Sequence, residues 1–199
     1  MSHFFTVVIV PGDTLAEQIE ELVARLLAPY NENLRVDPSK VYLDDQEREC
    51  MASYYHVAPH NLAELARHLE DWAGQSGGVD ERGLYRWCTY NPQAKWDWWV
   101  IGGRWNGAIR AAPRHDETGF NFGEEYHQLT ENMLPANQLD HTLTCFAVVT
   151  PDGIWHEQGK MGWWAVVTDE KDDAEWDKEL ISILQNHQDG MLVGVDCHI

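Results

Sequence analysis

The sequence predicts an α+β fold, because a β-α unit opens the chain, a β-β-α-β unit closes it and a long insertion separates the two. In order, these units match a ferredoxin-like split βαβ sandwich with a large insertion after the first helix. We therefore expect residues 1–29 to form the first β-α pair of the core and residues 141–199 to form its remainder. Residues 30–140 are expected to form an inserted, tryptophan-rich segment.

The opening unit begins with residues 3–10, which are rich in β-branched and aromatic side chains and predict a buried strand. We expect Asp13 or Thr14 to cap a helix after it. Apolar residues then recur at helical spacing and give that helix one apolar stripe. They are Leu15, Ile19, Leu22, Val23, Leu26 and Leu27. Pro29 is expected to end the helix.

The closing unit repeats this pattern with a hairpin in front of its helix. Residues 143–149 predict a strand, 150–153 a turn that contains proline and glycine, and 154–157 the returning strand. Residues 172–187 predict a helix with acids at its start, where the helix dipole favours them. Residues 191–199 predict a final strand, which a ferredoxin-like sheet would place at its edge.

The insertion contains two further helical segments, one near residues 44–55 and one near 61–72. A glycine-rich loop at 74–78 leads toward the main group of tryptophans. Residues 111–140 have no clear periodicity, so we expect a long loop there.

The charge balance is strongly acidic, with 33 Asp and Glu against 14 Lys and Arg and a formal net charge of −19. Such a surface argues against direct nucleic-acid binding, because phosphate contacts require cationic side chains. An acidic surface can instead imitate nucleic acid and occupy a basic groove on another protein. The oligomeric state cannot be read from the sequence.

Two further features concern the cellular compartment. No apolar run approaches the roughly 20 residues of a membrane span, and the first residues lack the basic and apolar regions of a secretion signal. We therefore expect a cytoplasmic protein with no membrane partner. The cysteines are scattered without a CxxC pair, which argues against a zinc ribbon and a thioredoxin-type motif and indicates four reduced thiols.

Tryptophan is concentrated in residues 96–105, beside a glycine pair and Arg104. If this segment is a strand, alternation places Trp96 and Trp98 on one face. The glycines permit a bend, after which Arg104 can present its guanidinium to a carboxylate or phosphate. We interpret this group, together with a second group that contains Trp163 and Trp164, as one wall of a binding site for a planar ligand. The candidate ligand-binding residues are Trp98, Trp99, Arg104, Trp105, Trp163 and Trp164. Alternatively, the tryptophans form core and Arg104 pairs with an acid.

The candidate catalytic residues, should the protein be an enzyme, are His156, Glu157 and His198. Histidine titrates near neutral pH and can transfer protons, and a neighbouring glutamate can assist it. Asp196 and His198 share one face of the last strand and could hold a metal with His156 as third ligand. At a sheet edge, however, Asp196 and His198 would face water, so we predict no metal and no cofactor.

The run of residues 91–105 resembles a motif of uncharacterised proteins from bacteriophages and prophages. The stretches 27–33, 155–164 and 196–199 look like the same family, so the resemblance spans nearly the whole chain. The chain departs from the pattern at Asn31, where an acid is more usual. The resemblance implies a phage or mobile-element context inside a bacterial host and implies no reaction.

Three functions remain open on these grounds. The favoured one is a phage-encoded, non-enzymatic binding protein that captures or inhibits a host protein, including a defence or nucleic-acid-handling protein, or a small nucleotide-like ligand. The second is a hydrolase or transferase that acts on a nucleotide or modified base. The third is a virion or assembly component. Convergence of His156, His198 and Arg104 in one cleft would favour the enzyme, and their separation on different faces would argue against it.

Overall fold

The computed structural model describes residues 2–109, 132–139, 143–162 and 166–199. The chain divides into two compact units. The first unit consists of Met1–Leu34 and Gln93–Ile199, and the second unit consists of Arg35–Pro92. We expected an inserted segment over 30–140, but the chain from Gln93 onward lies in the first unit. Within the described part of the chain, no helix is long and apolar enough to cross a membrane.

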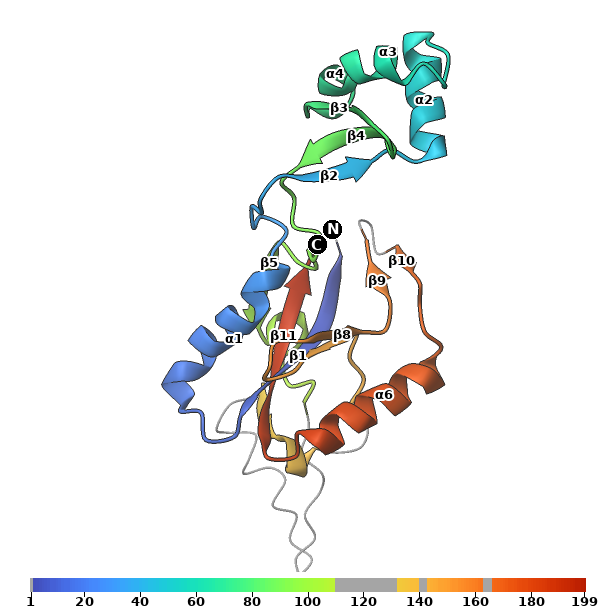
Figure 1. The fold of residues 1–199 in the computed structure, drawn as a ribbon. Helices are drawn as coiled ribbons and strands as arrows, with labels where there is room; N and C mark the ends of the chain where they lie inside the picture. Colours follow the sequence, from blue (N-terminus) through green and yellow to red (C-terminus); the bar gives the residue numbers. More distant parts are fainter. Residues whose placement is uncertain (1, 110–131, 140–142, 163–165) are drawn as a thin grey trace, which may run out of the picture. The chain divides into compact units, whose positions relative to one another are not determined.

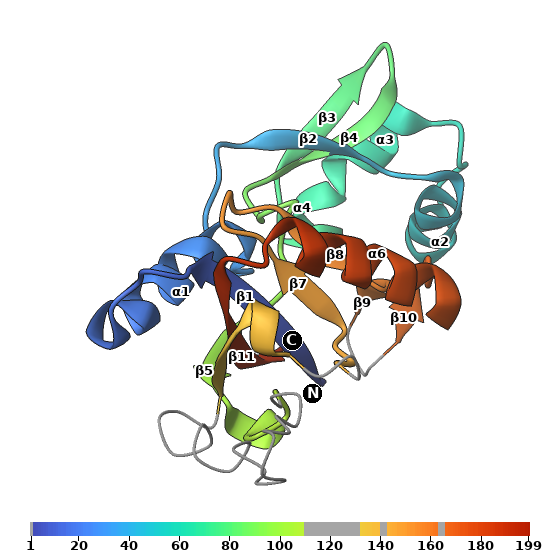
Figure 2. The ribbon, with the colours of Figure 1, turned by 90° about the horizontal axis from the view of Figure 1, so that it is seen from below.

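The first unit is built on a six-stranded sheet in which β5, β11, β1, β7 and β8 lie in that order and β6 pairs with β11. The strands are β1 (His3–Pro11), β5 (Trp98–Ile101), β6 (Met133–Pro135), β7 (Ala147–Val149), β8 (Trp155–Glu157) and β11 (Gly190–His198). β1 and β11 pair antiparallel over nine residues, so the two termini lie side by side (Figures 1 and 2). A separate short pair joins β9 (Lys160–Met161) to β10 (Val167–Thr168).

Two helices, α1 (Ile19–Leu27) and α6 (Asp173–Asn186), pack on opposite faces of this sheet (Figure 1). Both faces of β1 are therefore apolar. Phe4, Val8 and Val10 lie in the core with α1, whereas Val7 and Ile9 lie in the core with α6. The described residues of this unit also form four short 3₁₀ helices. They are η1 (Ala16–Gln18), η2 (Ala28–Tyr30), η3 (Gly103–Trp105) and η4 (Ala136–Gln138).

The helix starts that the sequence predicts are found at α6 but not at α1. Asp172 caps α6, since its side chain accepts a hydrogen bond from the backbone N–H of Glu175. The predicted cap of the first helix is wrong. The Thr14 hydroxyl donates to the carbonyl of Pro11, and a turn of 3₁₀ helix precedes α1. That bond keeps Thr14 in the turn after β1, so its hydroxyl does not serve the helix.

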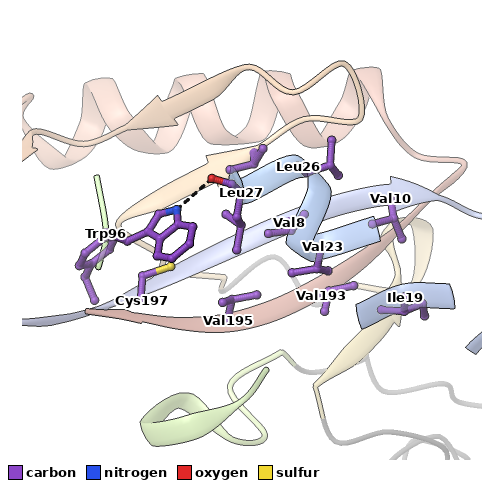
Figure 3. Close-up of a cluster of buried hydrophobic side chains, with 12 residues drawn as sticks. Val8, Val10, Ile19, Val23, Leu26, Leu27, Trp96, Val193, Val195 and Cys197 are labelled. Carbon is purple, nitrogen blue, oxygen red and sulfur yellow. Dashed lines mark hydrogen bonds between the residues drawn. The ribbon is translucent and has the colours of Figure 1, made fainter. Parts of the chain in front are cut away.

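Trp96 belongs to the core on the α1 side. Its indole is 6% exposed, and its Nε1–H donates to the carbonyl of Leu27 at 3.0 Å, at the end of α1 (Figure 3). The bond satisfies a carbonyl in the last turn of the helix, which has no partner within the helix itself. Trp99 packs against the same cluster. Part of the tryptophan-rich segment is thus structural.

The α+β class is confirmed, but the strand order differs from a split βαβ unit. In a split unit another strand lies between two parallel strands, whereas β7 lies directly beside β1 and runs parallel to it. β8 pairs antiparallel with β7 at the edge of the sheet. Burial explains the order. Every residue of β7 is fully buried, which suits an interior position, whereas every residue of β8 is only partly buried.

We expected the last strand at an edge of the sheet, and this prediction is wrong. β11 lies between β1 and β5, because the tryptophan-rich strand β5 pairs with its outer side. Asp196 is consequently 1% exposed and does not face water.

The second unit has a three-stranded antiparallel sheet in the order β2, β4, β3 and three short helices. Its elements are β2 (Ser39–Tyr42), α2 (Asp45–Tyr55), α3 (Leu62–Arg67), α4 (Leu69–Ala73), β3 (Gly77–Asp80) and β4 (Gly83–Cys88). The helices share a core with Leu84 of β4. Asp44 forms a capping box with Glu47 at the start of α2. The second predicted helix is divided in two at His68.

Candidate functional site

The first member of the site is a pair formed across the two terminal strands. The Nδ1 atom of His3 on β1 lies 2.9 Å from Oδ1 of Asp196 on β11. The side chain of Asp196 is 2% exposed and that of His3 is 17% exposed. A carboxylate so deeply buried requires hydrogen-bond donors, because desolvation of an unpaired charge is costly. His3 supplies one of these donors.

The second donor to Asp196 comes from the turn after β5. The backbone N–H of Arg104 donates to Oδ2 of Asp196 at 2.9 Å. Gly102 and Gly103 permit this approach, since both have positive φ, 76° and 54°. A Cβ on Gly103 would lie 2.5 Å from Oδ2 of Asp196. The glycine pair therefore brings the chain over the buried carboxylate.

A second histidine–aspartate pair lies beside the first. Nδ1 of His198, the last residue of β11, lies 2.6 Å from Oδ1 of Asp97. The backbone N–H of Asp97 also donates to the carbonyl of His198 at 2.9 Å. This double contact fixes the carboxylate and the imidazole together as the chain enters β5. Asp97 is the more accessible of the two acids, with 32% of its side chain exposed.

The two imidazoles contact each other. Strand register aligns His3 with His198, and their ring centroids are 4.8 Å apart with the planes at 68°. The indole of Trp98 stands edge-on to His3 at 6.2 Å and is half exposed. His3, Asp97, Trp98, Asp196 and His198 are called the paired-histidine site below.

The pairings fix the chemistry that each ring can perform. A carboxylate only accepts hydrogen bonds, so the Nδ1 atom of each ring carries the hydrogen. Nε2 then holds the lone pair of the neutral imidazole and can accept a proton. A carboxylate on Nδ1 also orients the ring. Both histidines are thus equipped for acid–base work.

The site does not have the ligand arrangement of a metal centre. Within the ranges that the structure describes, no group of three or more His, Cys, Asp or Glu side chains could hold a metal ion. The combination of Asp196, His198 and His156 considered above is not assembled, because β1 and β7 separate β11 from β8.

His156 and Glu157 lie elsewhere in the sheet and on opposite faces of β8. Nδ1 of His156 pairs with Oε1 of Glu179 on α6 at 3.2 Å. Glu157 accepts from Lys95 at 2.5 Å and from the Trp155 indole at 2.8 Å. Neither joins His198, so the structure does not bring the three candidate catalytic residues together.

The candidate ligand-binding residues also separate. Trp98 belongs to the paired-histidine site, and Trp99 packs into the core. Arg104 is exposed and approaches the site through its backbone. Trp105 is 36% exposed and stacks on Phe5, the strand neighbour of the site on β1, with centroids 5.5 Å apart. Trp163 and Trp164 lie outside the described residues.

The prediction that Trp96 and Trp98 lie on one face of a strand is also wrong. β5 begins only at Trp98, so the chain turns between the two residues, and Trp96 is buried while Trp98 is half exposed. The sequence reasoning also missed His3 and Asp97. The available signal was the pairing of the first strand with the last, which aligns one histidine from each terminus.

Comparison with protein-family models, with curated proteins and with solved structures found no match.

Proposed function

We propose that the first unit is an acid–base enzyme, a hydrolase or transferase for a nucleotide-like substrate, with His3 and His198 as its catalytic residues. The observation that carries this proposal is the pair of neighbouring imidazoles, each bound through Nδ1 to its own carboxylate. Two such rings can divide the work of a displacement reaction. One ring, neutral with a lone pair on Nε2, accepts a proton from the attacking hydroxyl or water. The other enters the reaction as an imidazolium and donates its Nε2 proton to the leaving group, whose bond to the substrate breaks.

The environments of the two acids differ, which suits a division of roles. Asp196 is sealed between β1, β11 and the Gly102–Gly103 turn, so it orients His3 rigidly. Asp97 has 32% of its side chain exposed, so it holds His198 less rigidly than Asp196 holds His3. We assign proton abstraction to His3 and protonation of the leaving group to His198.

The substrate class follows from what surrounds the rings. Trp98 offers an exposed indole on which a planar base can stack. Arg104 follows directly on the turn that caps Asp196, and a guanidinium suits the geometry of a phosphate. A base and a phosphate together describe a nucleotide.

The test is a substrate screen with the 199-residue chain. Linear and cyclic mononucleotides and dinucleotides are incubated with the wild type, and the products are separated by liquid chromatography. We expect conversion of at least one class, and loss of that conversion in His198→Ala. His156→Ala is the matched control, because His156 also pairs with a carboxylate but lies on β8. No conversion of any substrate by the wild type would contradict the proposal.

The second candidate is the binding protein, and the exposure of Trp98 and Trp105 favours it. In that case the site captures a nucleotide-like ligand or a host protein without chemistry, in the phage context that the sequence resemblance implies. Arg104→Ala would then abolish capture while the melting temperature stays nearly unchanged. Binding that persists in His3→Ala and His198→Ala, with no turnover by the wild type, would select this alternative.

A further inference from the structure

The second unit carries an aromatic face that its own helices leave uncovered. Strand register pairs Lys40 with Trp87 and Tyr42 with Tyr85, so these four side chains share one face of the sheet. Leu84 alternates to the other face and is 1% exposed in the core with the helices. We call Lys40, Tyr42, Tyr85 and Trp87 the aromatic face.

The rings of this face form a continuous row. The centroids of Tyr42 and Tyr85 are 5.9 Å apart, and those of Tyr85 and Trp87 are 5.6 Å apart. Trp87, at one end of the row, is 40% exposed. Aromatic rings on a sheet are effective surfaces for unpaired bases, because every base has a π face to stack.

Cations lie among these rings. Nζ of Lys40 is 4.1 Å from the centroid of Tyr85 and 5.7 Å from that of Trp87. The guanidinium of Arg82 lies 4.2 Å from the centroid of Tyr42. Each cation is held on a ring, so it is positioned before any ligand arrives.

One acid shares the network. Asp80 accepts from Lys40 at 2.7 Å and from the Tyr42 hydroxyl at 2.9 Å. Glu81 lies between Asp80 and Arg82 in the chain, so the two cations Lys40 and Arg82 are matched by two acids. Arg86, on the opposite face by alternation, pairs instead with Glu47 of α2 at 3.5 Å. The local charge of this face is therefore close to zero, in contrast to the net charge of −19 on the whole chain.

We propose that the aromatic face binds single-stranded nucleic acid, with bases stacked on Trp87 and Tyr85 and phosphates neutralised by Lys40 and Arg82. The expectation of no direct nucleic-acid contact came from the net charge, which is an average over the chain. Binding depends on the charge within about one Debye length of the contact, about 8 Å at physiological ionic strength. The proposal is independent of catalysis in the first unit.

The test measures the fluorescence anisotropy of a labelled 12-nucleotide oligo(dT) and oligo(U) with the 199-residue chain at low salt. We expect Trp87→Ala to weaken binding about tenfold, as befits the loss of one stacked base. Lys40→Ala with Arg82→Ala should weaken it further and flatten the salt dependence, because each lost phosphate contact reduces the slope of log K against log salt by about 0.7.

Matched controls come from the helices of the same unit. Trp72→Ala removes an indole of similar exposure on α4, and Arg67→Ala removes an exposed cation on α3. Both should bind like the wild type, and thermal melting should show that every variant is folded. The proposal is overturned if the wild type does not bind, if Trp72→Ala weakens binding as much as Trp87→Ala, or if polyglutamate competes as well as the unlabelled oligonucleotide. His3→Ala and His198→Ala should bind normally, so this proposal and that for the first unit fail separately.

Discussion

The imidazole of His3 and the carboxylate of Asp196 join the first and last strands, at 2.9 Å, although 193 positions separate them in the chain. Asp196 accepts in addition from the backbone of Arg104, which follows the tryptophan-rich strand β5. A single buried carboxylate thus connects three separate segments. Its environment determines both the stability of this end of the sheet and the orientation of the His3 imidazole, which we propose to be catalytic.

Replacement of Asp196 should therefore cost stability as well as activity. Asp196→Ala leaves the His3 Nδ1–H and the Arg104 N–H without their acceptor, and we expect a loss of about 1–3 kcal/mol in the free energy of unfolding. Asp97→Ala should cost less, because Asp97 is partly solvated. Urea denaturation of both variants measures the difference. Equal losses in the free energy of unfolding would mean that the burial of Asp196 adds nothing to the cost of removing its carboxylate.

The glycine that covers Asp196 provides a second prediction. Gly103→Ala must accommodate φ of 54° and a Cβ 2.5 Å from the Asp196 side chain, so we expect a loss of about 1–3 kcal/mol. Gly107→Ala is the control, since Gly107 has φ of 72° but no atom near the added Cβ. Thermal melts should show a clearly larger decrease for Gly103→Ala. An equal decrease for the two variants would assign the whole cost to the positive φ and none to the contact with Asp196.

The cysteines should differ sharply in reactivity. Burial raises the pKa of the Cys197 thiol to about 12 and raises that of Cys145 as well. At pH 8 about one Cys197 in ten thousand is then a thiolate, the form that reacts with alkylating agents. Cys50 is exposed. Mass spectrometry after brief iodoacetamide treatment should find Cys50 modified and Cys145 and Cys197 unmodified until urea is added. Early modification of Cys197 would contradict the buried packing of β11.

The second unit should weaken in acid through Asp80. The hydrogen bond from Lys40 lowers the pKa of Asp80 to about 2, from 3.8. Because the folded-state pKa lies below the unfolded one, this contribution to stability is present above pH 3.8 and is lost as the pH falls toward 2. The melting temperature of Asp80→Asn should thus be below that of the wild type at pH 6, and the gap should narrow by pH 3. A difference in melting temperature that widens in acid would contradict the lowered pKa of Asp80.

Much of the fold was predictable because its signals are local. The β-branched run at 3–10, the acid caps Asp44 and Asp172 and the proline–glycine turn before β8 depend on neighbouring residues alone. Strand order was not predictable in this way. β7 takes its place beside β1 because of burial across the whole sheet, which depends on contacts distant in sequence.

The candidate site shows the same division. His198 and Trp98 were singled out from their motifs, whereas His3 and Asp97 have no motif beyond ordinary strand and loop residues. They become notable only through the antiparallel register of β1 with β11, and through the pairing of β5 with the outer side of β11. The glutamate next to His156 made a plausible partner in sequence, but alternation along β8 turns the two side chains to opposite faces.

The most direct test is the turnover of the first unit in His3→Ala, His198→Ala, the double variant and His156→Ala, on the substrate class found by the nucleotide screen. If the two imidazoles act as one unit, each single variant loses about 10²–10⁴-fold in rate, the double variant loses little more than the worse single one, and His156→Ala keeps the wild-type rate. Full turnover in both His3→Ala and His198→Ala, or equal loss in His156→Ala, would contradict the proposed catalytic role of the paired-histidine site.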